Sequence, residues 1–208
     1  MADDRLQPPL AEAGMRIGLF GGSFNPPHEG HRLVALECLK RLALGKVWVL
    51  VSPGNPLKDH TDLAPLAERL AATAAVMDDP RLEVTGFEAT RGLTYTYETL
   101  RFLTEAHGGT HFVWIMGADS LQSFDHWERW RDIAHLVPMA VYARPGAGLR
   151  ATRSVAATAL RGARIPETEA ETLASRHPPA WVYLRGVMSA ASSTAIRDAR
   201  RAPSVKPR

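Results

Sequence analysis

Two kinds of hydrophobic pattern alternate along the 208 residues. Short runs rich in β-branched and aromatic residues, typical of buried strands, lie at residues 15–20, 46–52, 82–87, 111–117, 139–144 and 180–185. Segments with helical spacing separate them, at residues 31–44, 63–77, 95–107, 126–136 and, less regularly, 151–175, and a short helix is expected from 192. Such alternation predicts a Rossmann-like, doubly wound α/β fold, with helices on both faces of a mainly parallel sheet.

The predicted elements form one domain, from residue 15 to residue 198. No linker rich in Gly, Pro or Ser divides it. The segment from Arg144 to Pro179 contains the breakers RPGAG, RIPE and HPP, which predict an excursion on the surface. Residues 1–14 and the basic residues 199–208 lie outside the pattern, and we expect both ends to be disordered.

Composition excludes several classes of protein. No run approaches the ~20 apolar residues of a membrane-spanning helix, and the acidic N-terminus lacks a signal-peptide pattern, so a cytoplasmic protein is expected. The last ten residues carry four basic side chains and no acidic one, which leaves residues 1–198 nearly neutral. We therefore expect no nucleic-acid or membrane partner; an RNA-binding tail is the remote alternative. The single cysteine, Cys38, lies among apolar residues and is expected to be buried.

The sequence GLFGGSFNPPHEGH, residues 18–31, interrupts the first hydrophobic run. In a doubly wound sheet, the turn after the first strand is the usual place of phosphate contact. Gly21 and Gly22 allow the backbone to approach a ligand closely, and Pro26 with Pro27 stiffens the loop. The patterns G-x-G-x-x-G and G-x-x-x-x-G-K-[ST] are both absent, so this loop is not one of the common nucleotide loops.

Two histidines follow these prolines at a spacing of three. If a helix begins near His28, His28 and His31 lie on one side of its first turn, at the positive end of the helix dipole. Imidazole donors and free backbone N–H groups there predict a polyphosphate site. Metal ligation is the alternative, but zinc needs three or four protein ligands, and His60, His107, His111 and His126 form no second ligand motif.

Three hydroxyl residues open the last predicted helix. Ser192, Ser193 and Thr194 precede Arg197 by less than two turns. Helix capping explains one hydroxyl, whereas Arg197 beside three hydroxyls also suits an anion. From these residues alone, a simple cap and an anion site both remain open.

Together, the two segments resemble one family. The run from Gly22 to His31 is similar to the G-x-F-x-P-x-H-x-G-H motif of the nucleotidylyltransferase superfamily, and the run from Ala191 to Arg197 is similar to its I-S-S-T-x-I-R motif, with Ala191 in place of Ile. The resemblance implies that the two histidines bind the phosphates of ATP and stabilise charge at the α-phosphate, without a covalent intermediate. The ATP-binding residues that it implies are Gly21, Gly22, Ser23, Phe24, His28, His31, Gly117, Asp119, Ser192, Ser193, Thr194 and Arg197.

Three further segments, at residues 52–58, 94–100 and 116–127, resemble the bacterial nicotinate-mononucleotide adenylyltransferases. That likeness implies adenosine contacts from Gly117 and Asp119, and a platform for the pyridine ring from Trp127. The nicotinate mononucleotide contacts that it implies are Asn55, Lys58, Thr94, Tyr95, Thr96 and Trp127. The catalytic groups that it implies are His28, His31, Lys58 and Arg197, although Leu57 stands where the family has His before the lysine.

The reaction that this resemblance implies is transfer of AMP from ATP to nicotinate mononucleotide, which gives nicotinate adenine dinucleotide and pyrophosphate in NAD biosynthesis. Mg²⁺ is expected to arrive with ATP, without a dedicated protein metal site. The alternatives are another acceptor, nicotinamide mononucleotide or pantetheine phosphate, and a non-catalytic nucleotide sensor. Simpler structural roles also remain open: Trp127 or Trp130 in a helix core, Asp119 as a helix cap, and Tyr95 and Tyr97 in packing.

Overall fold

A computed structural model describes residues 4–54, 62–143, 148–187, 189 and 191–201. Its six strands form one sheet in the order β3-β2-β1-β4-β5-β6, and every neighbouring pair is parallel. The strands are β1 (Arg16–Gly22), β2 (Lys46–Val51), β3 (Leu82–Thr85), β4 (His111–Gly117), β5 (Met139–Tyr142) and β6 (Trp181–Leu184). This order, with the chain crossing from β3 back to β4 beside β1, is the doubly wound order that the sequence predicts.

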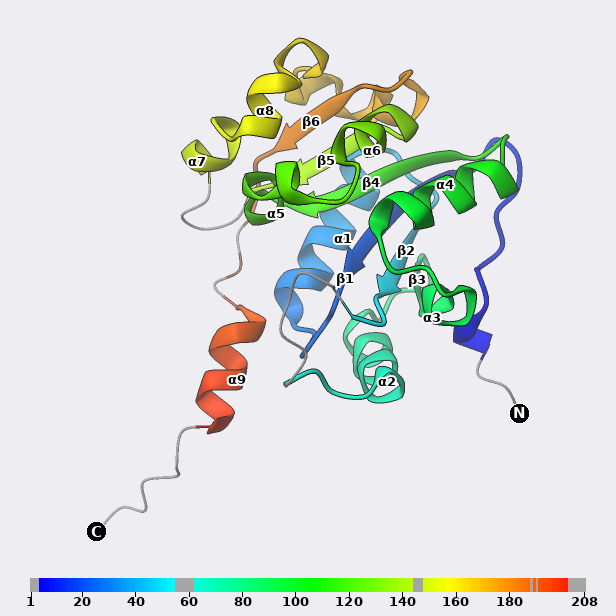
Figure 1. The fold of residues 1–208 in the computed structure, drawn as a ribbon, viewed down its shortest axis with the longest axis vertical. Coiled ribbons are helices and arrows are strands. Elements are labelled where there is room, and N and C mark those ends of the chain that lie inside the picture. The colour runs from blue at the N-terminus through cyan, green and yellow to red at the C-terminus, as the bar shows by residue number, and fades with distance from the viewer. Residues whose placement is uncertain (1–3, 55–61, 144–147, 188, 190, 202–208) are drawn as a thin grey trace.

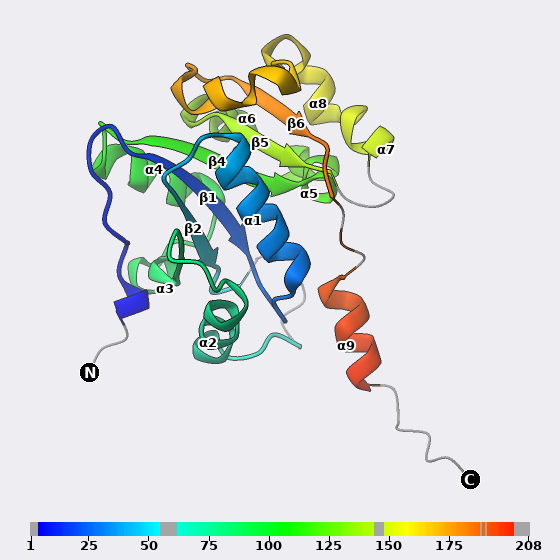
Figure 2. The ribbon, with the colours of Figure 1, turned by 180° about the vertical axis from the view of Figure 1, so that it is seen from behind.

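Helices cover both faces of the sheet (Figures 1 and 2). One face carries α1 (Glu29–Arg41), α2 (Leu66–Val76) and the 3₁₀ segment η4 (Glu167–Ser175). The other carries α3 (Phe87–Arg91), α4 (Thr96–Ala106), α5 (Ala118–Gln122), η2 (Phe124–His126), α6 (Trp130–Leu136), α7 (Gly148–Thr152) and α8 (Val155–Ala159). η3 (Arg161–Ala163) follows α8, and α9 (Ser193–Arg201) projects from the body, as both views show.

Side chains from the sheet alternate between two hydrophobic cores. In β1 and β2, Leu19 and Trp48 point to the core under α4 and α6, while Phe20 and Val49 point to the core under α1 and α2. Because a strand buried on both faces needs apolar residues at every position, the run KVWVLV shows no period of two. This continuous hydrophobic run therefore marks an interior strand of the sheet.

β1 and β4 are neighbours at the centre of the sheet. From β1 the chain continues to β2 on one side, and after β3 it returns to β4 on the other. The connections therefore diverge here, and the carboxyl ends of β1 and β4, at Gly22 and Gly117, form the switch point where ligands bind in such sheets.

The structure corrects the expectation for the N-terminus. Within residues 1–14, which the pattern predicts to be disordered, η1 (Asp4–Leu6) lies against β3 and α3. The Thr85 hydroxyl lies 2.9 Å from the carbonyl oxygen of Arg5, and the Thr90 hydroxyl donates to that of Leu6. Backbone carbonyls therefore hold this polar segment in place, a contact that apolar periodicity does not report.

Other parts of the chain also differ from the prediction. The third strand ends at Thr85, because Gly86 begins α3. The helix expected at 126–136 begins only at Trp130, after Arg129 with φ of 52°. The predicted surface excursion instead packs on the sheet in part, since Ala156, Leu173 and other apolar residues of its short helices are buried. At the C-terminus, α9 ends at Arg201, as the expected helix SSTAIRDARR does, so the first three residues of the predicted basic tail are helical.

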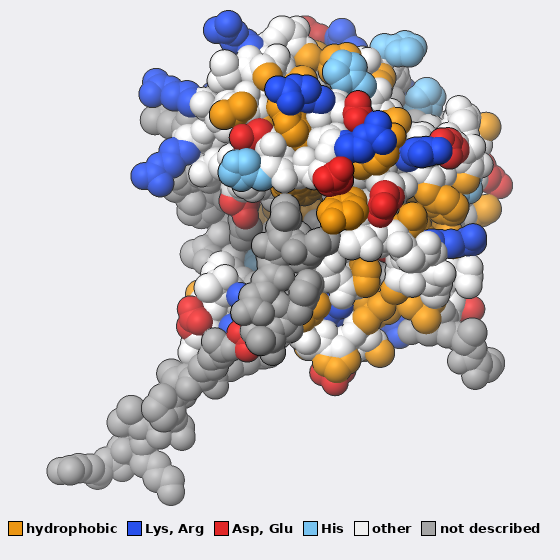
Figure 3. All heavy atoms as spheres, viewed as in Figure 1, with side chains coloured by type: hydrophobic (Ala, Val, Ile, Leu, Met, Phe, Trp, Pro, Cys, Tyr) orange, Lys and Arg blue, Asp and Glu red, His pale blue; other side chains and the backbone are white. Residues whose placement is uncertain are grey.

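Cys38 is fully buried in α1, and burial raises the pKa of its thiol to about 12. The thiolate needed for nucleophilic chemistry is therefore scarce at neutral pH. Within the described part of the chain, no helix combines the length and apolarity needed to cross a bilayer. On the face drawn in Figure 3, basic and acidic side chains are interspersed over the upper half of the molecule.

Candidate active site

A cavity of about 560 Å³ opens at the carboxyl ends of β1 and β4. The cavity is lined by the loop after β1 and by the starts of α1, α5 and α9, which lie far apart in the sequence. The predicted ATP-binding residues all line it: Gly21, Gly22, Ser23, Phe24, His28, His31, Gly117, Asp119, Ser192, Ser193, Thr194 and Arg197.

The glycines of β1 are required by the neighbouring strand. A Cβ atom on Gly21 would lie 2.5 Å from Cη2 of Trp114, a buried residue of β4. Such an approach is far inside van der Waals contact, so the indole would have to move. The absence of a side chain at Gly21 therefore lets Trp114 form the wall of the cavity.

Phe24 supports the histidines more than it faces the cavity. Its ring is 2% exposed and meets the His31 ring edge to face, with centroids 5.0 Å apart. Its backbone has φ of 45°, an unfavourable value for a residue with a side chain. The loop holds this backbone conformation, which places the aromatic ring against the His31 imidazole and fixes the orientation of that imidazole.

His28 is the N-cap of α1, and its ring closes the first turn. Its Nδ1 atom accepts a hydrogen bond from the backbone N–H of Gly30 at 3.1 Å, and His31 Nδ1 accepts from the backbone N–H of His28 at 3.2 Å. A nitrogen that accepts cannot carry the proton of a neutral imidazole. In both neutral rings, the hydrogen-bond network therefore assigns the proton to Nε2.

The two imidazoles stack, with ring centroids 3.8 Å apart and an angle of 27° between the planes. Both lie on the first turn of α1, where the helix dipole is positive. Gly30 must lack a side chain here, because a Cβ would lie 2.9 Å from His28 Nδ1. The result is a pair of Nε2–H donors held side by side at a site that favours an anion.

The start of α9 is fastened to the loop after β1. The Ser193 hydroxyl donates to the carbonyl oxygen of Pro26 at 2.8 Å, and the Arg197 guanidinium donates to that of Asn25. Ser192 is the cap, since its hydroxyl accepts from the backbone N–H of Ala195 at 3.1 Å. The sequence left capping and anion binding open, and the structure gives Ser192 the capping bond while Ser193 and Arg197 tie α9 to the cavity.

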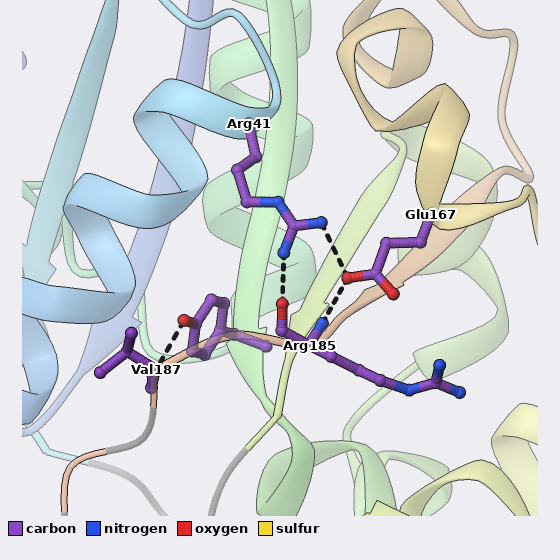
Figure 4. A network of polar contacts seen from close by, with 5 residues as sticks. Arg41, Glu167, Arg185 and Val187 are labelled. Carbon is purple, nitrogen blue, oxygen red and sulfur yellow. Dashed lines mark hydrogen bonds and ion pairs between the residues drawn. The ribbon is translucent and has the colours of Figure 1, made fainter.

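A polar network fixes the chain as it leaves β6 toward α9 (Figure 4). Glu167 Oε1 accepts from the Arg41 guanidinium and from the backbone N–H of Arg185, each at 2.7 Å, and Arg41 also donates to the carbonyl oxygen of Arg185. Burial opposes ionisation of Glu167, but these two donors outweigh it and hold the pKa of Glu167 below its ordinary value. The Tyr142 hydroxyl donates to Val187 at 3.0 Å, which anchors the next residues.

A second cavity of about 160 Å³ adjoins the first. The residues shared by both are Gly21, Gly22, Ser23, Trp114, Ser120 and Trp127. Of the predicted acceptor residues, Thr94, Tyr95, Thr96 and Trp127 line this second cavity, whereas Asn55 and Lys58 lie outside the described residues. The structure thus brings the two predicted substrate regions side by side at the switch point.

Trp127 and Trp130 occupy different environments. Trp130 is 7% exposed in α6 and packs on Phe124, with centroids 5.9 Å apart. Trp127 is half-buried between η2 and α6 and meets Trp114 edge to face at 6.2 Å. The core role considered for both therefore belongs to Trp130, while Trp127 presents part of its ring to the cavities.

The start of α4 offers fewer donors than the sequence suggests. Glu98 Oε2 accepts from the backbone N–H groups of Thr94 and Tyr95, at 2.9 and 3.1 Å, and these two bonds lower the pKa of Glu98. Those amides are occupied within the protein. The donors left for a ligand are the hydroxyls of Thr94, Tyr95 and Thr96 and the N–H groups of the first helical turn.

Asp119 does not cap α5, because the N-cap is Gly117 and Asp119 lies in the first helical turn. Its side chain is exposed and lines the larger cavity. Two buried charged residues that the motifs do not indicate also border the site, Arg69 in α2 and Glu88 in α3. In the sequence, each appears only as an ionisable residue near apolar ones. Exposed helices commonly show the same pattern, so it does not identify a buried charge.

Arg69 is 3% exposed, and all of its hydrogen-bond acceptors among the described residues are backbone carbonyls. Its guanidinium reaches Ser23 at 2.9 Å, after β1, and Ser52 at 2.7 Å, after β2. Burial lowers the pKa of Arg69, yet a guanidinium stays charged in proteins. One buried cation therefore joins the two loops that form the floor of the cavities.

Comparison with known proteins agrees with this geometry. Residues 19–199 match the model of a family described as cytidylyltransferase-like. A protein of Methylorubrum extorquens is 56% identical over 88% of this chain and 99% of its own length, and one of Rhizobium johnstonii is 51% identical over 91% and 96%. Both carry the name "Probable nicotinate-nucleotide adenylyltransferase".

Among solved structures, the Plasmodium falciparum nicotinic acid mononucleotide adenylyltransferase complexed with NaAD is similar in fold. The TM-score is 0.66 at 16% sequence identity, over 88% of this chain and 83% of that one. At this identity the likeness concerns the fold.

Proposed function

The chain belongs to the cytidylyltransferase-like family, and from that membership and the paired cavities we propose that it is a nicotinate-nucleotide adenylyltransferase of NAD biosynthesis. It transfers the adenylyl group of ATP to nicotinate mononucleotide, with nicotinate adenine dinucleotide and pyrophosphate as products. Relatives about half identical over nine-tenths of the chain support this activity. ATP as donor is compatible with the cytoplasmic location that the sequence predicts.

One observation carries the proposal: the cavity with the two histidines shares a wall with the cavity of Thr94 to Thr96. A transfer between two phosphates needs the donor and the acceptor side by side, with the reacting atoms about 3 to 3.5 Å apart. The shared residues Gly21, Gly22 and Trp127 mark where the two substrates would meet. Donor and acceptor thus have separate sites and one common point of reaction.

The chemical step is an in-line displacement. A phosphate oxygen of nicotinate mononucleotide attacks the α-phosphorus of ATP, the new P–O bond forms, and the bond from the α-phosphorus to the bridging oxygen breaks. That oxygen leaves as part of pyrophosphate. Such transfers depend on positioning and charge stabilisation and need no nucleophile from the protein.

The residues of the larger cavity are suited to that task. The Nε2–H groups of His28 and His31 would donate to the α- and β-phosphates, and the first turn of α1 adds its positive dipole. The hydroxyl of Thr194 and the N–H groups of Arg197 that do not bond Asn25 or Thr194 would bind the leaving pyrophosphate, while Ser193 holds the start of this helix through Pro26. Lys58, which the resemblance makes a further phosphate contact, stays a prediction.

Mg²⁺ is expected to come with ATP. Asp119 is the one carboxylate among the described residues that line the larger cavity. Mg²⁺ keeps several waters and binds largely through substrate phosphates, so no dedicated protein site is needed, and Asp119 keeps the role of adenosine contact that the resemblance implies. The ion would neutralise charge on the triphosphate.

The proposal is tested by pyrophosphate release from ATP and Mg²⁺ with three acceptors in turn: nicotinate mononucleotide, nicotinamide mononucleotide and pantetheine phosphate. We expect the highest kcat/KM with nicotinate mononucleotide, and chromatography should show nicotinate adenine dinucleotide in an amount equal to the pyrophosphate. Faster reaction with either other acceptor would reassign the substrate. No release with any of them would leave a nucleotide sensor.

A further inference from the structure

Glu88 is a buried acid that the proposed reaction does not use. It lies in α3, its side chain is 9% exposed, and it lines the smaller cavity together with Thr94, Tyr95 and Thr96. An ionisable residue at this depth is costly unless its charge is compensated. Its place beside the predicted acceptor residues suggests a use in recognition.

The carboxyl of Glu88 is fixed by one neighbour. Its Oε1 accepts a hydrogen bond of 2.6 Å from the hydroxyl of Thr99, which is fully buried in α4. Among the described residues, Thr99 is the only one that hydrogen-bonds this carboxyl. The second carboxyl oxygen therefore remains for whatever occupies the cavity.

Among the described residues that line the cavity, none carries a positive charge to balance this acid. The lining contains Glu88 and Glu128, and it holds no Lys, Arg or His among the residues that the structure describes. Desolvation by burial raises the pKa of Glu88, and the Thr99 hydroxyl offsets only part of that effect. The neutral form, with a proton on its carboxyl, therefore persists to a higher pH than in an exposed glutamate.

We propose that Glu88 determines the choice of acceptor in the proposed reaction: its protonated carboxyl donates a hydrogen bond to the carboxylate of nicotinate mononucleotide. When Glu88 is ionised, it repels that carboxylate and accepts from the amide of nicotinamide mononucleotide instead. The protonated form of Glu88 therefore favours nicotinate mononucleotide, and the ionised form favours nicotinamide mononucleotide. The inference rests on the proposed function, because it concerns the occupant of the acceptor cavity.

Other charged groups surround α3. They are Arg91 on α3, Glu98 on α4, Glu128 across the cavity, Asp4 and Arg5 on η1, and Arg69 behind the loop at Ser23. The phosphates of ATP and of the acceptor are common to both reactions, and the variant E88Q keeps all of these charged neighbours. The ratio of the two kcat/KM values cancels these shared effects and isolates a group that touches carboxylate and amide differently.

The experiment measures kcat/KM for nicotinate and nicotinamide mononucleotides from about pH 5 to about pH 9, a range that includes documented buried glutamates. For the wild type we expect the nicotinate-to-nicotinamide ratio to be constant at low pH and to fall by about tenfold per pH unit once Glu88 ionises. In E88Q, the amide accepts from Thr99 and donates to the cavity at every pH. Its ratio should therefore be constant across the range.

T99V provides a second variant that keeps Glu88 itself. Loss of the hydroxyl removes the bond that favours the ionised form, so the fall in the ratio should move to higher pH. A ratio that falls equally in wild type and E88Q, or that is flat in the wild type, would overturn the role of Glu88. The proposed function would survive either result, whereas no dinucleotide from either acceptor would overturn the function itself.

Discussion

The hydroxyl of Ser193 donates a 2.8 Å hydrogen bond to the carbonyl oxygen of Pro26, across 167 residues of sequence. With Arg197 and Asn25, this pair joins the last helix to the first loop. The two segments that resemble the nucleotidylyltransferase motifs therefore touch directly. The phosphate site depends on that contact, because neither segment encloses the cavity alone.

Replacing Ser193 by Ala should loosen this attachment. A hydrogen bond of this kind contributes about 1 kcal/mol, so we expect KM for ATP to rise about fivefold, with little change in KM for the acceptor. Thr172→Ala is the matched control, since its hydroxyl donates to Glu169 at the same 2.8 Å on an exposed surface. Equal effects of both substitutions on KM for ATP would contradict the role of Ser193.

Trp127 and Trp130 provide a test of the acceptor cavity. Loss of an aromatic ring that stacks on a base costs about 1–3 kcal/mol, so Trp127→Leu should raise KM for nicotinate mononucleotide about tenfold and change the unfolding temperature little. Trp130→Leu should do the reverse, because Trp130 is a buried core residue. Steady-state kinetics and calorimetry on both variants separate the two roles. Unchanged acceptor binding in Trp127→Leu would remove its ring from the acceptor site.

Arg69 should be among the most sensitive positions for stability. Arg69→Met would leave the carbonyl oxygens of Ser23 and Ser52 without their donor, and a buried group in that state costs about 1–3 kcal/mol. We therefore expect urea denaturation to show a loss of about 3 kcal/mol or more. Arg69→Lys keeps the charge but loses the planar fork, so its loss should be intermediate. A fully stable Arg69→Met protein would show that these loops need no buried cation.

Glu88 should also make stability depend on pH. Its folded pKa is raised above the ordinary value of 4.5, so between those two values the folded protein holds a proton that the unfolded chain has lost. The contribution of Glu88 to stability is therefore complete below the unfolded pKa and is lost as pH rises through the folded pKa. Glu88→Gln should be relatively more stable as pH increases, measured by urea denaturation at several pH values. A constant stability difference between the two proteins would contradict this.

Much of the fold follows from the sequence, because its strands are buried on both faces. Runs such as KVWVLV can be satisfied only inside a covered parallel sheet. The site also follows in part, since His28 and His31 at a spacing of three must share one side of a first helical turn. At these positions the residue pattern along the chain and the packing of the folded protein require the same structure.

The remaining features depend on contacts distant in sequence. Arg69 binds carbonyl oxygens 46 and 17 residues away, and the acid of Glu88 faces a cavity that exists only after α4 has packed. The helix expected from residue 126 begins later, because Trp127 turns to the cavity and Arg129 adopts a left-handed backbone. Periodicity reports which residues are apolar, but it does not report which polar groups find a partner after folding.

The central claim is that His28 and His31 use Nδ1 for the helix and Nε2–H for the triphosphate. His28→Asn separates these functions. Asn is a favoured N-cap, and its side-chain oxygen can accept from the Gly30 N–H as Nδ1 does, but its shorter side-chain NH2 group does not extend to the position of the imidazole Nε2–H. His28→Ala is the companion variant, which loses both.

The deciding measurement is kcat for adenylyl transfer to nicotinate mononucleotide by wild type, His28→Asn and His28→Ala, with the unfolding temperature of each. We predict that His28→Asn unfolds at or above the wild-type temperature while its kcat falls about 10²-fold or more, the usual loss for one donor at a developing negative charge. His28→Ala should lose both stability and turnover. A folded His28→Asn protein with wild-type kcat would contradict the account.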